Sequence, residues 1–116
     1  MISKNFIVDY YDCSEEFTAY TNNIIGLLQK FLEHSELKVE CLTYRQFEPF
    51  GVTAIAILSE SSVTLHTYVE EKIITLDIDI CNFEKETKVL HAIQLFGNML
   101  NSNRYTLKTL ERGKPK

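Results

Sequence analysis

Apolar and polar residues alternate along most of this chain, and the period of the alternation separates strands from helices. A period of two predicts a strand, whereas apolar residues three and four positions apart predict one face of a helix. Helical spacing follows the stretch DCSEE, where Asp12 or Ser14 is an expected N-cap, and it returns from Asn82 to Leu100. The apolar face of the first helix carries Phe17, Tyr20, Ile24, Leu27, Leu28 and Phe31. Strands are expected at residues 5–11, 37–47, 52–58, 63–68, 72–80 and 104–110.

The expected elements follow one another in the order β-α-β-β-β-β-α-β. Short connections between the middle strands predict an antiparallel meander, because parallel strands need long crossovers. Two helices beside these strands indicate an α+β fold, a two-layer α/β sandwich with both helices on one face of an antiparallel sheet. We expect one domain over residues 1–116, with residues 111–116 as a solvated tail.

The second face of the expected sheet is polar. Alternation places the aliphatic residues of 63–68 and 72–80 on the helix side and directs the intervening side chains away from the helices. This uncovered face includes His66, Tyr68, Asp77, Asp79 and Cys81. The pattern is compatible with a wet sheet surface or with the lining of a polar cleft that a second subunit closes. Antiparallel sheets commonly solvate one side, which favours the wet surface.

Composition limits the choice of ligand and compartment. The chain has 116 residues, 45% of them hydrophobic, and a formal net charge of −4. This balance gives no basic surface for nucleic acid and no polybasic patch for a membrane. No apolar run reaches the ~18 residues of a membrane span. The cysteines, Cys13, Cys41 and Cys81, lack metal-ligand spacing and indicate free thiols in a reducing compartment, so we expect a cytoplasmic protein.

Few residues indicate a reaction when each is considered alone. Ser61 lies between two expected strands, where serine is usually a turn residue, and no acid is placed to orient His66 as in a serine hydrolase. Asp77 and Asp79 have a spacing that metal ligands use, but a solvated polar face explains them better, and we expect no metal. The sequence contains no phosphate loop, dinucleotide fingerprint or zinc-protease helix.

One long stretch resembles a known family. Residues 51–81 read GVTAIAILSESSVTLHTYVEEKIITLDIDIC. They are similar to the core of the small prokaryotic S-adenosylmethionine decarboxylases, in which a strand ends in Glu-Ser-His, a His-Thr-Trp-Pro-Glu stretch follows, and the next strand ends in Cys-Gly. The resemblance extends from DYYDC at residues 9–13, through FEPFGV at residues 47–52, to ERG at residues 111–113.

This resemblance implies an enzyme that processes itself. The spacing of Ser61, His66 and Cys81 matches the family without a gap. The Ser61 hydroxyl would attack the carbonyl of Glu60, the chain would be cut between these two residues, and the former serine would become a covalent pyruvoyl cofactor that forms a Schiff base with the substrate. His66 would then act as acid and base in processing, Thr53 would position the reacting atoms, and Cys81 would return a proton to the substrate.

The resemblance also implies the substrate and its contacts. The reaction would convert S-adenosylmethionine to the decarboxylated aminopropyl donor for spermidine synthesis. Phe47 and Tyr68 match two aromatic positions between which the family holds the adenine, where stacking is worth roughly 1 kcal/mol per contact. Glu70 matches an acid that contacts the substrate.

Three departures from the family fall around the expected substrate pocket. Ser62 replaces a histidine, Tyr68-Val69 replaces Trp-Pro, and Asn82 replaces a glycine. These departures leave open a related pyruvoyl-dependent enzyme that decarboxylates a basic amino acid, arginine or ornithine. An uncleaved homologue with a binding or regulatory role is a further alternative from a different class.

The expected site requires a second subunit. A single small domain with both helices on one side leaves His66 and Cys81 open to water, which would hydrolyse the covalent intermediate. We therefore expect a homodimer with α/β/β/α layers and two equivalent sites near the interface, a geometry that the resemblance also implies.

Overall fold

The computed structural model describes residues 1–59 and 61–115, and its strands match the expected ones to within two residues at each end. The strands are β1 (Ser3–Tyr10), β2 (Val39–Gln46), β3 (Val52–Leu58), β4 (Ser62–Tyr68), β5 (Ile73–Ile80) and β6 (Tyr105–Arg112). The helices are α1 (Glu15–Thr18), α2 (Thr21–Ser35) and α3 (Glu86–Met99), and a short 3₁₀ turn, η1 (Phe83–Lys85), leads into α3.

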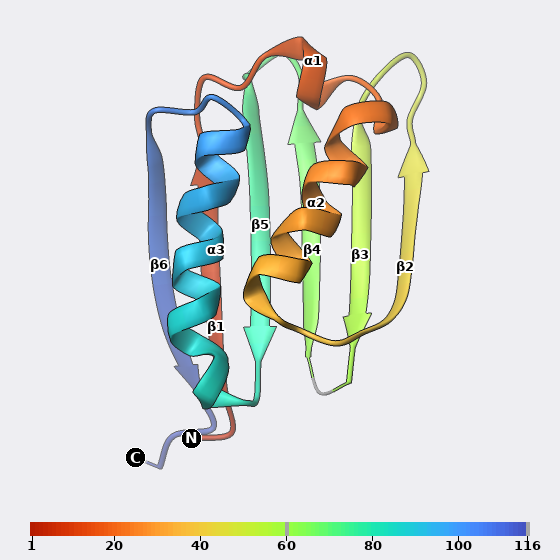
Figure 1. Cartoon of the computed structure of the whole chain (residues 1–116). Coiled ribbons are helices and arrows are strands. Elements are labelled where there is room, and N and C mark those ends of the chain that lie inside the picture. Colours follow the sequence, from red (N-terminus) through yellow and green to blue (C-terminus); the bar gives the residue numbers. More distant parts are fainter. Residues whose placement is uncertain (60, 116) are drawn as a thin grey trace.

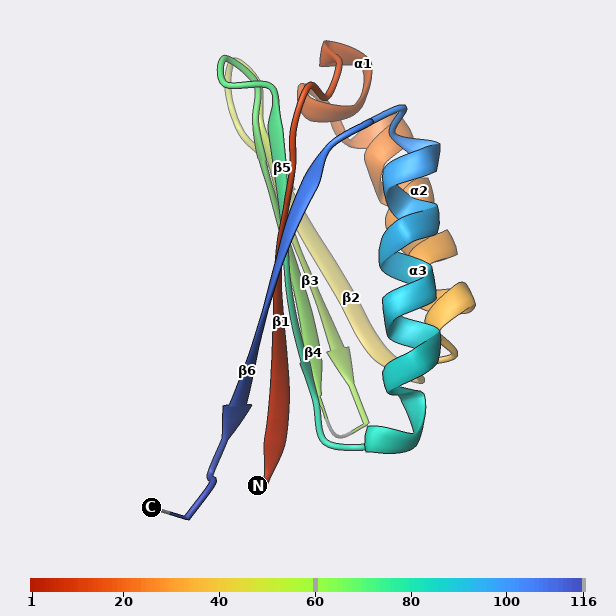
Figure 2. The ribbon, with the colours of Figure 1, turned by 90° about the vertical axis from the view of Figure 1, so that its left-hand side faces the viewer.

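The strands form one antiparallel sheet in the order β2-β3-β4-β5-β1-β6 (Figure 1). The expected meander is confirmed and runs from β2 to β5, after which the chain passes through α3 and places β6 beside β1. Helices α2 and α3 both lie on one face of the sheet, and the other face is uncovered in the described chain (Figure 2). The two-layer α+β architecture is therefore confirmed.

Alternation determines which strand side chains enter the core. The buried residues of β3 and β4 are Val52, Ala54, Ala56, Leu58, Val63, Leu65 and Thr67. Helices α2 and α3 cover them with Phe31 and Phe96, whose rings meet edge to face with centroids 5.8 Å apart. Tyr10 of β1 lies in the same core, and its hydroxyl donates a hydrogen bond of 2.7 Å to the Ile93 carbonyl of α3.

The expected first helix is wrong in one respect, because the structure divides it at Ala19 and Tyr20 into α1 and α2. Gln46 of β2 holds this break. Its Oε1 accepts a hydrogen bond of 2.9 Å from the Thr21 N–H, and its Nε2 donates one of 2.9 Å to the Ala19 carbonyl. A continuous helix would pair both backbone groups internally. Tyr20, expected on the apolar face, is therefore 54% exposed.

Two other boundaries differ from the expectation. Helix α3 begins at Glu86 rather than at Asn82, because the Asn82 side chain accepts a hydrogen bond from the Glu84 N–H and caps the η1 turn instead. Strand β6 includes Glu111 and Arg112, which the sequence placed in a solvated tail, because the ladder with β1 continues through them. No helix among the described residues has both the length and the apolar character needed to cross a membrane.

Candidate functional site

The uncovered sheet face carries the polar side chains that alternation placed there. His66 and Tyr68 of β4, and Asp77 and Asp79 of β5, alternate with fully buried residues and lie opposite the helices. The assignment of these residues to the uncovered face is confirmed. The strand register then decides which of them meet.

Thr53 and His66 form the closest contact between expected site residues. They are directly opposed in the ladder between β3 and β4. The Thr53 hydroxyl lies 2.8 Å from Nδ1 of His66, and both residues are partly buried. This hydrogen bond fixes the plane of the imidazole ring and directs Nε2 away from Thr53. The ring is therefore held in one orientation, as an acid-base group requires.

The two expected adenine-stacking residues lie at one end of this face, the end near α1. Phe47 directly follows β2 and Tyr68 ends β4, so that they lie on either side of β3. Both rings are close to half exposed, and Arg45 places its guanidinium 5.5 Å from the centroid of the Phe47 ring. Glu70 lies in the turn that follows Tyr68 and is exposed, so all the expected substrate contacts gather at this end.

Ser61 and Cys81 lie at the opposite end of the sheet, near η1. The Ser61 carbonyl accepts a hydrogen bond of 2.9 Å from the Leu58 N–H, and Ser61 borders a hollow of about 250 Å³ that Asn82 and Lys85 also line. Cys81 follows β5 and is exposed. The hairpin between β3 and β4 thus places Ser61 on the helix side of the sheet end.

The structure therefore divides the expected reaction residues into two groups. Five positions along the strand separate Ser61 from His66, which corresponds to about 16 Å at the usual rise of a strand. Thr53 and His66 are brought together, whereas Ser61 and Cys81 are at the other end. Glu60 lies outside the described residues.

Asp79, which also lies on the uncovered face, has no role in the reaction expected from the sequence. Asp79 is partly buried, and its Oδ1 is a buried atom without a hydrogen-bond partner among the residues that the structure describes. Its neighbour in the ladder, Asn5, instead donates from Nδ2 to Oδ1 of Asp77 at 2.6 Å. Alternation could place Asp79 on this face, but only the side-chain packing shows that it lacks a partner.

Comparison with known proteins decides the family. The family model for S-adenosylmethionine decarboxylase matches residues 4–113, which is nearly the whole chain. The chain belongs to the S-adenosylmethionine decarboxylase family. The resemblance that residues 51–81 carried is therefore confirmed.

Relatives of this decarboxylase family support the same conclusion. An S-adenosylmethionine decarboxylase proenzyme of Archaeoglobus fulgidus is 30% identical over 113 residues, covering 97% of this chain and 99% of the relative. A proenzyme of the same name from Prochlorococcus marinus is 31% identical over 118 residues, covering 99% and 93%. The crystal structure of the adenosylmethionine decarboxylase from Aquifex aeolicus matches with a TM-score of 0.86 at 23% identity, covering 99% of this chain and 93% of that one. The last likeness shows the shared fold.

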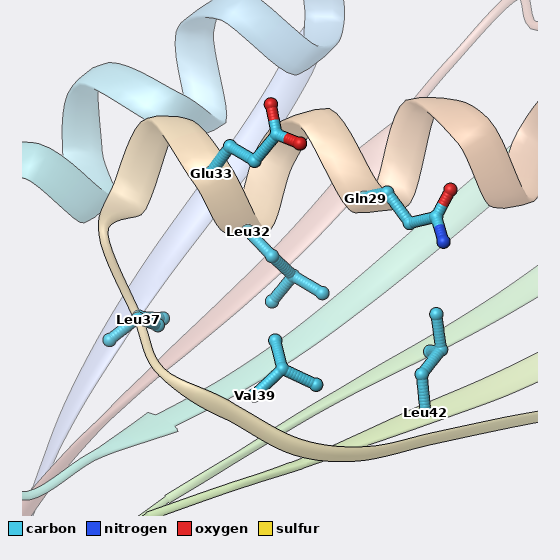
Figure 3. Close-up of a pocket in the computed structure, with 6 residues that line it drawn as sticks. All are labelled: Gln29, Leu32, Glu33, Leu37, Val39 and Leu42. Carbon is cyan, nitrogen blue, oxygen red and sulfur yellow. The ribbon is translucent and has the colours of Figure 1, made fainter.

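A larger hollow lies away from the residues that match the decarboxylase family. It has a volume of about 420 Å³ and opens between the C-terminal half of α2 and the start of β2 (Figure 3). Its lining consists of Gln29, Leu32, Glu33, Leu37, Val39 and Leu42. This lining shares no residue with the expected site.

Proposed function

We propose that the chain is a self-processing decarboxylase that converts S-adenosylmethionine to the decarboxylated aminopropyl donor of spermidine synthesis. The family match over residues 4–113 is the observation that carries this assignment. The enzyme class expected from the sequence, an S-adenosylmethionine decarboxylase, is confirmed by this membership. The cleavage, the cofactor and the residue roles are our proposals.

We place the self-cleavage between Glu60 and Ser61. A serine suits this position because an oxygen on Cβ can form an ester with the preceding carbonyl and then be eliminated. The surrounding strands support the proposal: β3 and β4 are paired with each other, and they are also paired with β2 and β5. Residues 1–60 and 61–116 would therefore stay together through the sheet after cleavage.

The cofactor would be a pyruvoyl group made from Ser61. Such a group supplies a carbonyl that condenses with the substrate amine and withdraws electrons from the α-carbon as carbon dioxide leaves. The residues around it fit this use, because Ser61 is half buried at a chain turn and borders a hollow of about 250 Å³. Cys81 ends the neighbouring strand at the same end of the sheet, and we assign it the return of a proton to the α-carbon.

We assign the processing chemistry to His66, with Thr53 as its positioning residue. The 2.8 Å contact between the hydroxyl and Nδ1 holds the ring while the imidazole moves protons during cleavage. Because His66 lies about 16 Å from Ser61 along β4 of the same chain, we propose that the two meet across the homodimer, where His66 of one copy would act on Ser61 of the other.

Substrate recognition is assigned to the end of the face near α1. The rings of Phe47 and Tyr68 would stack on the adenine, and Glu70 would contact the substrate as a hydrogen-bond acceptor. Since Tyr68 lies seven positions from Ser61, about 23 Å along β4, these contacts in one copy would serve the pyruvoyl group of the other copy in the dimer. A homodimer that covers the uncovered face would exclude water from both ends of this site. Free thiols at Cys13, Cys41 and Cys81 in the described chain support a reducing compartment, and we propose the cytoplasm.

Two measurements on purified protein test this function. Denaturing electrophoresis should resolve fragments of residues 1–60 and 61–116, and carboxyl-labelled S-adenosylmethionine should release labelled carbon dioxide. The Ser61→Ala variant is the control and should stay uncleaved and inactive. An intact wild-type chain would support the uncleaved homologue. A cleaved chain that releases carbon dioxide from arginine or ornithine, but not from S-adenosylmethionine, would overturn the substrate.

A further inference from the structure

The Asp79 carboxylate on the uncovered face has an oxygen with no partner. Its Oδ1 is buried from solvent and has no hydrogen-bond donor among the described residues. Buried polar atoms in folded proteins are nearly always paired, because an unmet acceptor destabilises the fold. An unpaired buried acceptor therefore indicates that its hydrogen-bond donor comes from a bound molecule.

Asp79 lies where the proposed reaction would take place. It is directly opposed to Ser62, which follows the proposed pyruvoyl precursor Ser61, in the ladder between β4 and β5. Opposed side chains in a ladder are about 5 Å apart at Cβ. On its own strand, Asp79 is two positions before Cys81, so both side chains belong to the same face and lie about 7 Å apart. A substrate carbon held between residue 61 and the Cys81 thiol on the uncovered face would lie within reach of Asp79.

Of the two acids that β5 places on this face, Asp79 is the one with a buried oxygen that has no donor among the described residues. Asp77 already accepts a hydrogen bond of 2.6 Å from Nδ2 of Asn5. The same Asn5 nitrogen also donates to the Ile78 carbonyl at 3.1 Å, so it is directed away from the free oxygen of Asp79.

We propose that Asp79 binds the α-ammonium group of S-adenosylmethionine and so determines how the amino-acid end of the substrate enters the site. This inference rests on the proposed function. The ammonium group is one bond from the reacting carbon, carries positive charge and has three donors, which match an unpaired carboxylate oxygen. Hydrogen bonds between charged partners are about twice as strong as neutral ones, so this contact can orient the substrate before the reaction.

The Asp79→Asn variant tests the proposal, because asparagine keeps the shape of the side chain and removes its charge. We expect cleavage into two fragments as in the wild type, a KM for S-adenosylmethionine raised about 10- to 100-fold, and a kcat within about threefold of wild type. Asp79→Glu should recover part of the lost affinity. Asp77→Asn is the matched control and should leave KM within about twofold, because Asp77 is already paired within the fold.

A second ligand separates the ammonium from the other charge of the substrate. A dimethylsulfonium derivative of adenosine has the sulfonium but lacks the amino-acid part, and calorimetry gives its dissociation constant without turnover. We expect this analogue to bind the wild type and Asp79→Asn equally. The thermal unfolding temperature of Asp79→Asn should equal or exceed that of the wild type, since an unmet carboxylate has been removed.

Several outcomes would overturn the proposal. An unchanged KM would show that Asp79 does not hold the substrate, and weaker binding of the analogue would place the contact at the sulfonium. Failed cleavage or a lowered unfolding temperature in Asp79→Asn would indicate a structural role instead. If the wild type neither cleaves itself nor releases carbon dioxide, the proposed function itself fails. A defect found only in the Asp79 variant leaves the proposed function intact and concerns Asp79 alone.

Discussion

The Thr53 hydroxyl shows how strand register brings together two residues that are 13 positions apart in the sequence. The sequence could predict the face of each residue, because alternation in a strand is strict. The contact itself depends on the register between β3 and β4, which the hairpin sets. The unpaired Asp79 oxygen is harder to predict from the sequence, because the Asn5 side chain donates to Asp77 and not to Asp79. The sequence pattern alone could not supply that information.

Replacing Thr53 tests its positioning of His66. Thr53→Val keeps the volume of the side chain but removes the hydroxyl, so the imidazole loses its 2.8 Å contact. We expect self-cleavage to slow about 10- to 100-fold, a part of what an acid-base group contributes to such a reaction. Thr53→Ser retains the hydroxyl and should cleave at nearly the wild-type rate. A time course on denaturing gels measures both rates, and equal half-times for valine and wild type would contradict the role.

The three thiols should differ in reactivity. Burial raises the pKa of the Cys13 thiol from 9.0 to about 11, whereas Cys41 and Cys81 are exposed. At pH 8 a thiol with that pKa is about 0.1% thiolate. We expect iodoacetamide to label Cys41 and Cys81 in the native protein, and Cys13 only after denaturation. Peptide mass spectrometry identifies the labelled residues, and rapid labelling of native Cys13 would contradict its burial.

The same pKa shift predicts how stability depends on pH. The folded Cys13 thiol keeps its proton to a higher pH than the unfolded thiol, whose pKa is 9.0. Its contribution to the free energy of unfolding is therefore fully present below pH 9 and is lost as the pH rises towards 11. Denaturant titrations at pH 8 and pH 10.5, with Cys13→Ala as the control, should show a smaller alkaline loss in the variant.

At the scale of elements, the break between α1 and α2 was the main error of the sequence interpretation. Apolar spacing continues from Phe17 to Phe31 without interruption, so the pattern predicted one helix. The break is stabilised from outside the helix by Gln46, which pairs with the Thr21 N–H and the Ala19 carbonyl. A side chain on a distant strand cannot be assigned to these partners before the fold is known.

Alanine substitutions at two helical glycines should change the stability of the fold in opposite directions. A Cβ at Gly26 of α2 would meet no atom within 4 Å, so Gly26→Ala should raise the free energy of unfolding by about 0.5–1 kcal/mol. A Cβ at Gly97 of α3 would lie 3.2 Å from Cε1 of Tyr10, a buried ring held by its bond to Ile93. Gly97→Ala should therefore lower that free energy by about 1–3 kcal/mol. Urea unfolding measures both, and equal stabilisation would show that the Tyr10 ring yields.

At the scale of the whole molecule, the fold class could be predicted but the strand order could not. Short connections between β2 and β5 made the meander predictable, because neighbours in sequence pair in space. The placement of β1 between β5 and β6 brings both ends of the chain into one sheet through long-range pairing that alternation does not encode. Among the described residues, no helix or further strand covers the second face of this sheet (Figure 2).

The uncovered face also predicts a dimer. Ile57 of β3 lies on this face between the polar residues and is 50% exposed, and Ile55 beside it is 38% exposed. Large exposed apolar side chains often mark an interface between two copies of a chain. The proposed reaction also requires that water is excluded from this face. We expect sedimentation at micromolar concentration to give twice the mass of one chain.

Substitution at the interface should separate the dimer from the fold. Ile57→Lys places a charge where two sheets would meet, so it should shift the protein to monomers and reduce carbon dioxide release at least tenfold, since burying an unpaired charge is strongly unfavourable. Leu90→Lys is the control, because Leu90 is 39% exposed on α3, away from the uncovered face, and should leave mass and activity unchanged. An active monomer in either the wild type or Ile57→Lys would contradict the requirement for a second subunit, because water would then reach His66 and Cys81 without stopping the reaction.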